Sequence, residues 1–322
     1  MKKFIKCIIL LCVIIFANSV VSAAEVKQSD DCSYKVVNER LKEAAIVKID
    51  NYENTIKIPA NVDGYKIVQI GTDKGDNVIN KVDKKVTELI IPEGVRTISK
   101  NAFYKTTALK KLQLPNSLRL IDENNFQNAK KLKSIHFKGN INVMNNCFKN
   151  VIFDKVVANG DITVGDCCDY EIGAKIKTLI IDCKKNGLDT VYINAGFKRI
   201  EKIVAKKSVK TLSTFCGYFD KISMENPDAR LSVNFNEVEI GKVIVTLKQP
   251  VKQNDGSYKY NWKHNNLAPA YVPDEKEVNV KYRVYEKKAG KSKVLKTVKK
   301  PEINLKKKGT YYVEVVYGYK DI

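Results

Sequence analysis

Apolar residues recur at fixed places in two consecutive stretches of the chain. "VTELIIPEGVRTISKNAFYKTTA" runs from Val86 to Ala108, and "LKKLQLPNSLRLIDENNFQNAKK" follows from Leu109 to Lys131. The two stretches match at Val86/Leu109, Leu89/Leu112, Ile91/Leu114, Pro92/Pro115, Val95/Leu118, Ile98/Ile121 and Phe103/Phe126. Weaker copies begin near residues 132, 153, 176 and 200. A pattern that repeats roughly every 23 residues predicts a solenoid of stacked coils.

Each copy opens with the alternation expected of a strand. Because strand side chains point to opposite faces in turn, Leu89 and Ile91 share the inward face. Pro92 has no backbone N–H to donate, so the strand ends there and the chain turns. One coil has a single apolar face that it cannot bury alone, so neighbouring coils must stack on it. We therefore expect Phe103 and Phe126 to stack along the interior.

The strand positions between the inward residues form a candidate binding face. Three of them, Ile90, Ile180 and Val204, are apolar, which a merely solvated face would not need. Either a ligand contacts these three side chains, or a following loop or a second domain covers them. The whole candidate face comprises Glu88, Ile90, Lys111, Gln113, Ser134, His136, Thr178, Ile180, Lys202 and Val204.

The coil resembles the BspA-type leucine-rich repeats of bacterial surface proteins, whose pattern is roughly L-x-x-I-x-I-P-x-x-V-x-x-I-G-x-x-A-F. "TIKIPANVDGYKIVQIG", from Thr55 to Gly71, resembles the first coil of that family. The resemblance covers about residues 34–230, and it departs where the glycine becomes Ser99 and Asp122. It implies a mainly β fold, with a solenoid of about seven to eight coils over residues 24–240 and a binding role.

The pattern of apolar and polar residues changes around Gly241. Short alternating runs separated by turn signals predict an antiparallel β-sandwich over residues 241–322. This part resembles a fibronectin type III or immunoglobulin-like module, with Trp262 as a core aromatic residue and with Leu305 and Tyr312 as its corner residues. The chain stops at Ile322, where a last strand is expected, which predicts a short or incomplete module.

Residues 1–23 have the pattern of a secretory signal peptide. A basic head precedes an apolar run from Ile8 to Phe16, and the segment ends in Val-x-Ala at Ala23. A membrane anchor would need about 20 apolar residues, whereas Asn18 interrupts this run. We therefore expect a chain that is secreted or extracellular, either free or associated with the cell wall, with no transmembrane span after cleavage.

The formal net charge of +21 indicates attraction to polyanions. Only three of these charges belong to the lysines of the leader. In an exported chain the polyanion would be an anionic wall polymer, an acidic glycan or a lipid headgroup, and no nucleic acid is expected. Alternatively, the lysines serve only solubility, because they are spread along the chain.

Candidate catalytic groups are few. The two histidines, His136 and His264, fall in different predicted domains and cannot form a local metal site. Cys147 stands where the repeat has a small core residue, which argues against a nucleophile paired with His136. "GDITVGDCCD" supplies Asp161, Asp166 and Asp169, but turn chemistry explains these residues as well as calcium does. We expect no catalytic residue, metal or cofactor.

Six cysteines follow the leader. They are either small core residues or partners in disulfides. The adjacent residues Cys167 and Cys168 are the two most open to disulfide pairing, each with a different partner. The six cysteines are Cys32, Cys147, Cys167, Cys168, Cys183 and Cys216.

The sequence therefore predicts a non-catalytic adhesin or interaction protein that binds a protein or glycan on a host, a neighbouring cell or the wall. A wall-associated protein that binds polyanions through its basic surface is the alternative.

Overall fold

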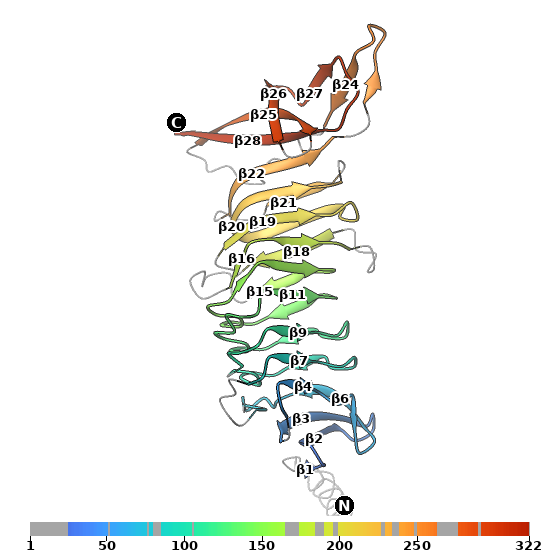
Figure 1. The fold of residues 1–322 in the computed structure, drawn as a ribbon, viewed down its shortest axis with the longest axis vertical. Helices are drawn as coiled ribbons and strands as arrows, with labels where there is room; N and C mark the ends of the chain where they lie inside the picture. Colours follow the sequence, from blue (N-terminus) through green and yellow to red (C-terminus); the bar gives the residue numbers. More distant parts are fainter. Residues whose placement is uncertain are drawn as a thin grey trace, which may run out of the picture.

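The computed structural model describes residues 25–50, 52–75, 77–79, 85–104, 106–164, 174–183, 190–195, 199–226, 229–233, 238–247, 250–262, 276–288 and 291–321. Every regular element in these ranges is a β-strand. The strands stack along one long axis, from β1 at the N-terminal end to the C-terminal strands at the other (Figure 1). The predicted leader, residues 1–23, lies outside the described residues. Within them, no helix is long and apolar enough to cross a membrane.

The opening strand of each coil joins a parallel stack that we call the ladder sheet. Successive strands pair in parallel register, and β9 lies beside β11 in the same stack. The ladder sheet contains β4 (Thr55–Lys57), β7 (Glu88–Ile90), β9 (Lys111–Gln113), β11 (Ser134–Phe137), β14 (Lys155–Ala158), β17 (Leu179–Ile181), β19 (Arg199–Ala205), β20 (Thr211–Met224) and β22 (Val238–Thr246).

The later strands of the coils form a second parallel stack, the return sheet. Its strands also pair coil to coil, and β20 contributes its first residues here and its last residues to the ladder sheet. The return sheet contains β3 (Glu43–Ile49), β6 (Tyr65–Ile70), β8 (Thr97–Ile98), β10 (Leu120–Ile121), β12 (Ile141–Val143), β15 (Ile162–Val164), β18 (Thr190–Ala195) and β21 (Arg230–Val233). Short strands β13 (Ile152–Phe153) and β16 (Lys175–Ile176) pair at the start of later coils.

Antiparallel strands close the N-terminal end of the stack. β1 (Val26–Gln28) pairs with β2 (Cys32–Asn38), β2 pairs with β3, and β5 (Asn61–Val62) forms a hairpin with β6. The hydroxyl of Tyr34 donates a hydrogen bond to Asp63 at 2.8 Å, which joins β2 to this hairpin. These strands cover the apolar end of the first coil, which a solenoid requires.

The core lies between the two sheets and follows the predicted alternation. Leu89 and Ile91 are buried, as are the matching residues in the later coils. The rings of Phe103 and Phe126 stack with centroids 5.5 Å apart, which confirms the predicted contact. Phe148 continues the column at 5.3 Å from Phe126. Neighbouring coils therefore share one continuous apolar core.

The C-terminal strands continue the ladder sheet. β22 pairs in parallel with β20 on one side and antiparallel with β28 (Tyr311–Asp321) on the other. β25 (Lys276–Lys288) then pairs with β28 and with β26 (Lys291–Val298). The boundary predicted at residue 240 falls inside β22, so the parallel stack extends beyond it. Four antiparallel-paired strands thus close the C-terminal end of the stack.

A second, smaller antiparallel sheet lies against this end. It contains β23 (Val251–Lys252), β24 (Tyr258–Asn261) and β27 (Glu302–Leu305). Trp262 is buried, as predicted, and its ring meets that of Tyr282 edge to face at 5.3 Å. Two facing antiparallel sheets partly fit the predicted sandwich. The corner residue differs from the prediction, because the hydroxyl of Tyr311, and not that of Tyr312, donates to the carbonyl of Lys307 at 3.0 Å.

Candidate functional site

The outward residues of the ladder sheet lie in two columns that run along the stack. Each short strand points its middle residue inward and its two flanking residues outward, so successive coils build up two columns. The register of the paired strands aligns the columns. The first column comprises Thr55, Glu88, Lys111, Ser134, Lys155, Thr178, Lys202 and Lys221. The second comprises Lys57, Ile90, Gln113, His136, Val157, Ile180, Val204, Ser223 and Ile244.

All ten residues of the predicted face lie on the outward side of this sheet. Four of them are exposed, namely Lys111, Gln113, Ser134 and His136. The other six are half-buried, namely Glu88, Ile90, Thr178, Ile180, Lys202 and Val204. The three apolar members are therefore partly exposed, and among the described residues neither a loop nor the C-terminal strands bury them fully.

The structure adds residues to both columns that the sequence reasoning missed. Lys155 and Val157 belong to the coil that begins at residue 153. Ser223 and Ile244 come from two further coils, "FDKISM" from Phe219 and "IGKVIV" from Ile240. Phe219, Ile222 and Met224 are buried at the spacing of the earlier copies, and this spacing was the available signal.

The second column contains a run of β-branched apolar residues. Register places Val157 beside Ile180, and Ile180 beside Val204. Ile244 follows one strand beyond Ser223. All four apolar residues are half-buried, so each keeps part of its side chain in contact with solvent. Neighbouring strands lie about 4.8 Å apart, so Val157, Ile180 and Val204 adjoin. With Ile244, which lies beyond Ser223, they form what we call the apolar strip.

Polar contacts fix the orientation of several residues of the face. The side-chain amide of Gln113 donates to Glu88 Oε1 at 3.0 Å, which links two neighbouring strands. His136 Nε2 and Asn159 Oδ1 lie 2.5 Å apart. His136 is exposed, as the sequence predicted, and its contact is with an amide. These contacts order the polar half of the face before any partner arrives.

The structure opposes a nucleophilic role for Cys147. Its thiol is buried and donates to the carbonyl of Asp122 at 2.9 Å. Burial raises the pKa of this thiol to about 12. Because the thiolate is the reactive form, a thiol with this pKa is inert at neutral pH.

We expect Cys147 in the folded protein to resist alkylation by iodoacetamide at pH 8 and to react once the chain is unfolded in urea. The raised pKa keeps the thiol protonated, and the packed core excludes the reagent. Peptide mass spectrometry after timed labelling measures the modified fraction. Equal labelling rates in the native and unfolded states would contradict the buried placement.

The remaining cysteines and candidate metal ligands form no site among the described residues. Cys32 and Cys183 are buried and free, like Cys147, which fits the core interpretation for these three. Cys167, Cys168, Asp166, Asp169 and His264 lie outside the described residues. In the described ranges, no group of three or more histidine, cysteine or acidic residues could hold a metal ion. Asp161 accepts hydrogen bonds from Asn140 Nδ2 and from the backbone N–H of Tyr192.

Comparisons with known proteins show what the repeats are similar to. Residues 79–170 match the model of the BspA type leucine rich repeat region, in six copies. A solved leucine rich repeat protein of T. pallidum is 18% identical, with a TM-score of 0.38 over 56% of this chain and 86% of that chain. A leucine-rich repeat protein from Bacteroides ovatus ATCC 8483 is 17% identical, with a TM-score of 0.36 over 66% of this chain and 76% of that chain. No curated protein gives a significant match. Over residues 79–170 this chain is therefore similar to BspA-type leucine-rich repeats.

Proposed function

We propose that this chain is a non-catalytic binding protein, secreted or held at the cell surface, that presents its ladder sheet to a protein or glycan partner. The apolar strip of Val157, Ile180, Val204 and Ile244 carries this proposal, because half-exposed apolar residues in register form a contact surface that solvation alone does not require. The stacked coils make the surface rigid, so a partner binds without ordering it first.

The chemistry of the face defines the partner that it would fit. Lys155 and Lys202 of the first column flank Val157 and Val204 of the second column on the same strands. An apolar ridge with acidic groups along one side would complement this arrangement. Such a ridge occurs on proteins and on glycans that carry acidic groups. The partner would lie on a host, on a neighbouring cell or in the wall.

The proposed location follows from the leader. Cleavage after Ala23 would release a chain that begins at Ala24 outside the cytoplasm. Bacterial surface proteins commonly carry repeats of the type found at residues 79–170, which supports the same placement.

We expect the double substitution Ile180→Lys and Val204→Lys to weaken partner capture at least tenfold while leaving the fold intact. Two charges in the strip oppose desolvation of an apolar contact, whereas surface changes alter folding stability by only about 0.5 kcal/mol. Surface plasmon resonance against purified extracellular-matrix proteins and purified wall polymers measures capture.

Val37→Lys supplies the matched control. Val37 is exposed on β2, away from the ladder sheet, so the same change in chemistry there should leave capture unchanged. If the double variant binds every positive member of the panel as the native chain does, the ladder sheet is not the contact surface.

The alternative function is polyanion binding through the lysines. Lys111, Lys155, Lys202 and Lys221 all stand in the first column, and the chain has a net charge of +21. Binding driven by charge weakens steeply as ionic strength rises, whereas a shaped apolar contact persists. The same binding assay repeated from low to high salt therefore separates the two functions.

A further inference from the structure

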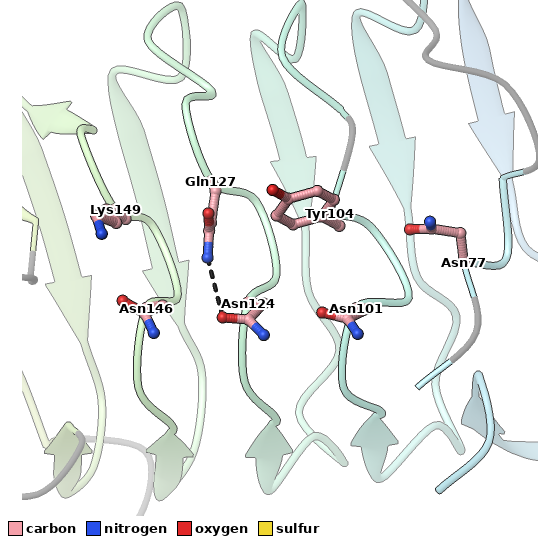
Figure 2. Close-up of a pocket in the computed structure, with 7 residues that line it drawn as sticks. All are labelled: Asn77, Asn101, Tyr104, Asn124, Gln127, Asn146 and Lys149. Carbon is pink, nitrogen blue, oxygen red and sulfur yellow. Dashed lines mark hydrogen bonds between the residues drawn. The ribbon is translucent and has the colours of Figure 1, made fainter. Parts of the chain in front are cut away.

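A polar hollow of about 530 Å³ lies on the edge of the solenoid where the chain turns from the return sheet towards the ladder sheet. Three consecutive coils each supply an asparagine and, three residues later, a longer side chain. Figure 2 shows the two rows that result, one of asparagines and one of the longer side chains. The lining residues are Asn77, Asn101, Tyr104, Asn124, Gln127, Asn146 and Lys149.

The backbone explains why asparagine occurs in this row. Asn101, Asn124 and Asn146 have φ angles of 60°, 63° and 60°, in the left-handed region that asparagine tolerates better than most residues. Asn128 and Asn150 have similar angles, 59° and 64°. Conformation alone therefore selects asparagine at both kinds of position, and it does not mark a binding site.

The side chains of the two sets differ in what they bond. Asn150 Nδ2 donates to Asn128 Oδ1 at 2.8 Å, so these two amides pair with each other outside the hollow. Inside the hollow, Asn146 Oδ1 is buried and has no hydrogen-bond partner among the described residues. A buried acceptor without a donor is costly, so rotation of the Asn146 side chain that turns its oxygen towards a hydroxyl group in the hollow would be favourable.

The other amides are ordered but retain bonding capacity. Asn101 Nδ2 donates to the carbonyl of Gly75 at 3.0 Å, and Gln127 Nε2 donates to Asn124 Oδ1 at 3.0 Å. A side-chain amide has two N–H donors and an oxygen with two lone pairs, so one bond leaves other groups available. These contacts hold the amides in place along the hollow. The row is thus prepared for a ligand that donates and accepts at each step.

From this geometry we infer that the hollow binds an extended, neutral glycan, with about one sugar residue per coil. Coils repeat about every 4.8 Å, close to the length of one sugar residue in an extended chain. Sugar hydroxyls donate and accept, as the amides do. Tyr104 is 42% exposed, and its ring offers an apolar face to a sugar ring. The seven described lining residues include no carboxylate and one lysine. This site is separate from the ladder sheet and does not rest on the proposed function.

The test measures binding of linear cello-, chito- and malto-hexasaccharides to the full chain by isothermal titration calorimetry. At least one of these probes should bind saturably at low millimolar concentration or tighter. The variant Asn101→Gly/Asn124→Gly keeps the left-handed backbone accessible and removes two amides. We expect it to weaken binding about tenfold, as the loss of two hydrogen bonds predicts. Tyr104→Ala should weaken binding by a similar factor.

Asn128→Gly is the matched control, because it changes the same residue type at the same backbone conformation outside the hollow. Its affinity should equal that of the native chain. Ile180→Lys/Val204→Lys on the ladder sheet should also leave hexasaccharide binding unchanged, which separates this site from the proposed function. Two results would overturn the inference. One is no binding of any probe, and the other is equal affinity for the native chain and Asn101→Gly/Asn124→Gly.

Discussion

Replacing Phe126 with alanine should lower the free energy of unfolding by about 3–5 kcal/mol. The ring of Phe126 is fully buried between those of Phe103 and Phe148, with centroid distances of 5.5 Å and 5.3 Å. Its removal leaves a cavity and breaks two stacked contacts. The backbone at Phe126 has a φ of 56°, which alanine must also adopt, so the difference reports the ring alone. Thermal and urea unfolding measure the loss.

The loss should be local, because each coil contacts mainly its neighbours. Hydrogen exchange should rise in the coils that begin at residues 86, 109 and 132 and should stay low in β25 and β28. Lys111→Ala is the control, since Lys111 is exposed on the ladder sheet, and it should change stability by no more than about 0.5 kcal/mol. A silent Phe126→Ala, or a Lys111→Ala that unfolds the repeats, would show that the inward and outward faces are reversed.

The alternation of inward and outward residues was predictable because it depends only on local geometry. Leu89 points inward and Ile90 outward for the same reason in every coil, and strand periodicity needs no knowledge of the neighbouring coil. The phenylalanine column was predictable as well, because identical places in a stacked repeat must meet. The alternation therefore predicts where the ladder sheet lies, but it indicates no partner for this sheet.

The end of the solenoid was not predictable from the pattern of apolar and polar residues. β22 (Val238–Thr246) reads as an alternating strand, and such a strand fits the last coil or the first strand of a sandwich equally well. Only the pairing distinguishes them, and β22 pairs with β20 on one side and β28 on the other. Tyr311 and Tyr312 show the same limit. The ring of Tyr311 meets that of Tyr260, and the ring of Tyr312 stacks on that of Tyr285. The sequence alone does not indicate which of the two tyrosines makes which contact.

The amide hollow escaped the sequence reasoning although a signal was present. An asparagine stands two residues before Phe103, Phe126 and Phe148 in three consecutive coils. The phenylalanines dominate the pattern because burial fixes them. The asparagines form one row only because their backbones adopt left-handed φ angles, which the sequence alone does not reveal.

Replacing Asn125 with alanine should destabilise the repeats by about 2–4 kcal/mol, because it leaves the buried N–H of Phe103 without its acceptor and removes one of the donors to two further carbonyls. The side chain of Asn125 is fully buried. Its oxygen accepts from the backbone N–H of Phe103 at 2.9 Å, and its nitrogen donates to the carbonyls of Ser99 at 2.9 Å and Asp122 at 2.6 Å. The residue thus joins two coils through three backbone groups. Urea unfolding and hydrogen exchange at the amide of Phe103 measure the effect.

The next coil provides the control for this prediction. Cys147 stands one repeat after Asn125, and its thiol donates to the carbonyl of Asp122. Asn125→Cys places the same group one coil earlier, where it can donate to a carbonyl but is a much weaker acceptor for the N–H of Phe103. We therefore expect Asn125→Cys to recover part of the stability that Asn125→Ala loses, while exchange at Phe103 stays fast in both variants. If Asn125→Ala unfolds at the same urea concentration as the native chain, the hydrogen bonds of Asn125 add nothing to stability and the prediction is wrong. If instead Asn125→Cys restores slow exchange at Phe103, the contact with that N–H is not what protects it.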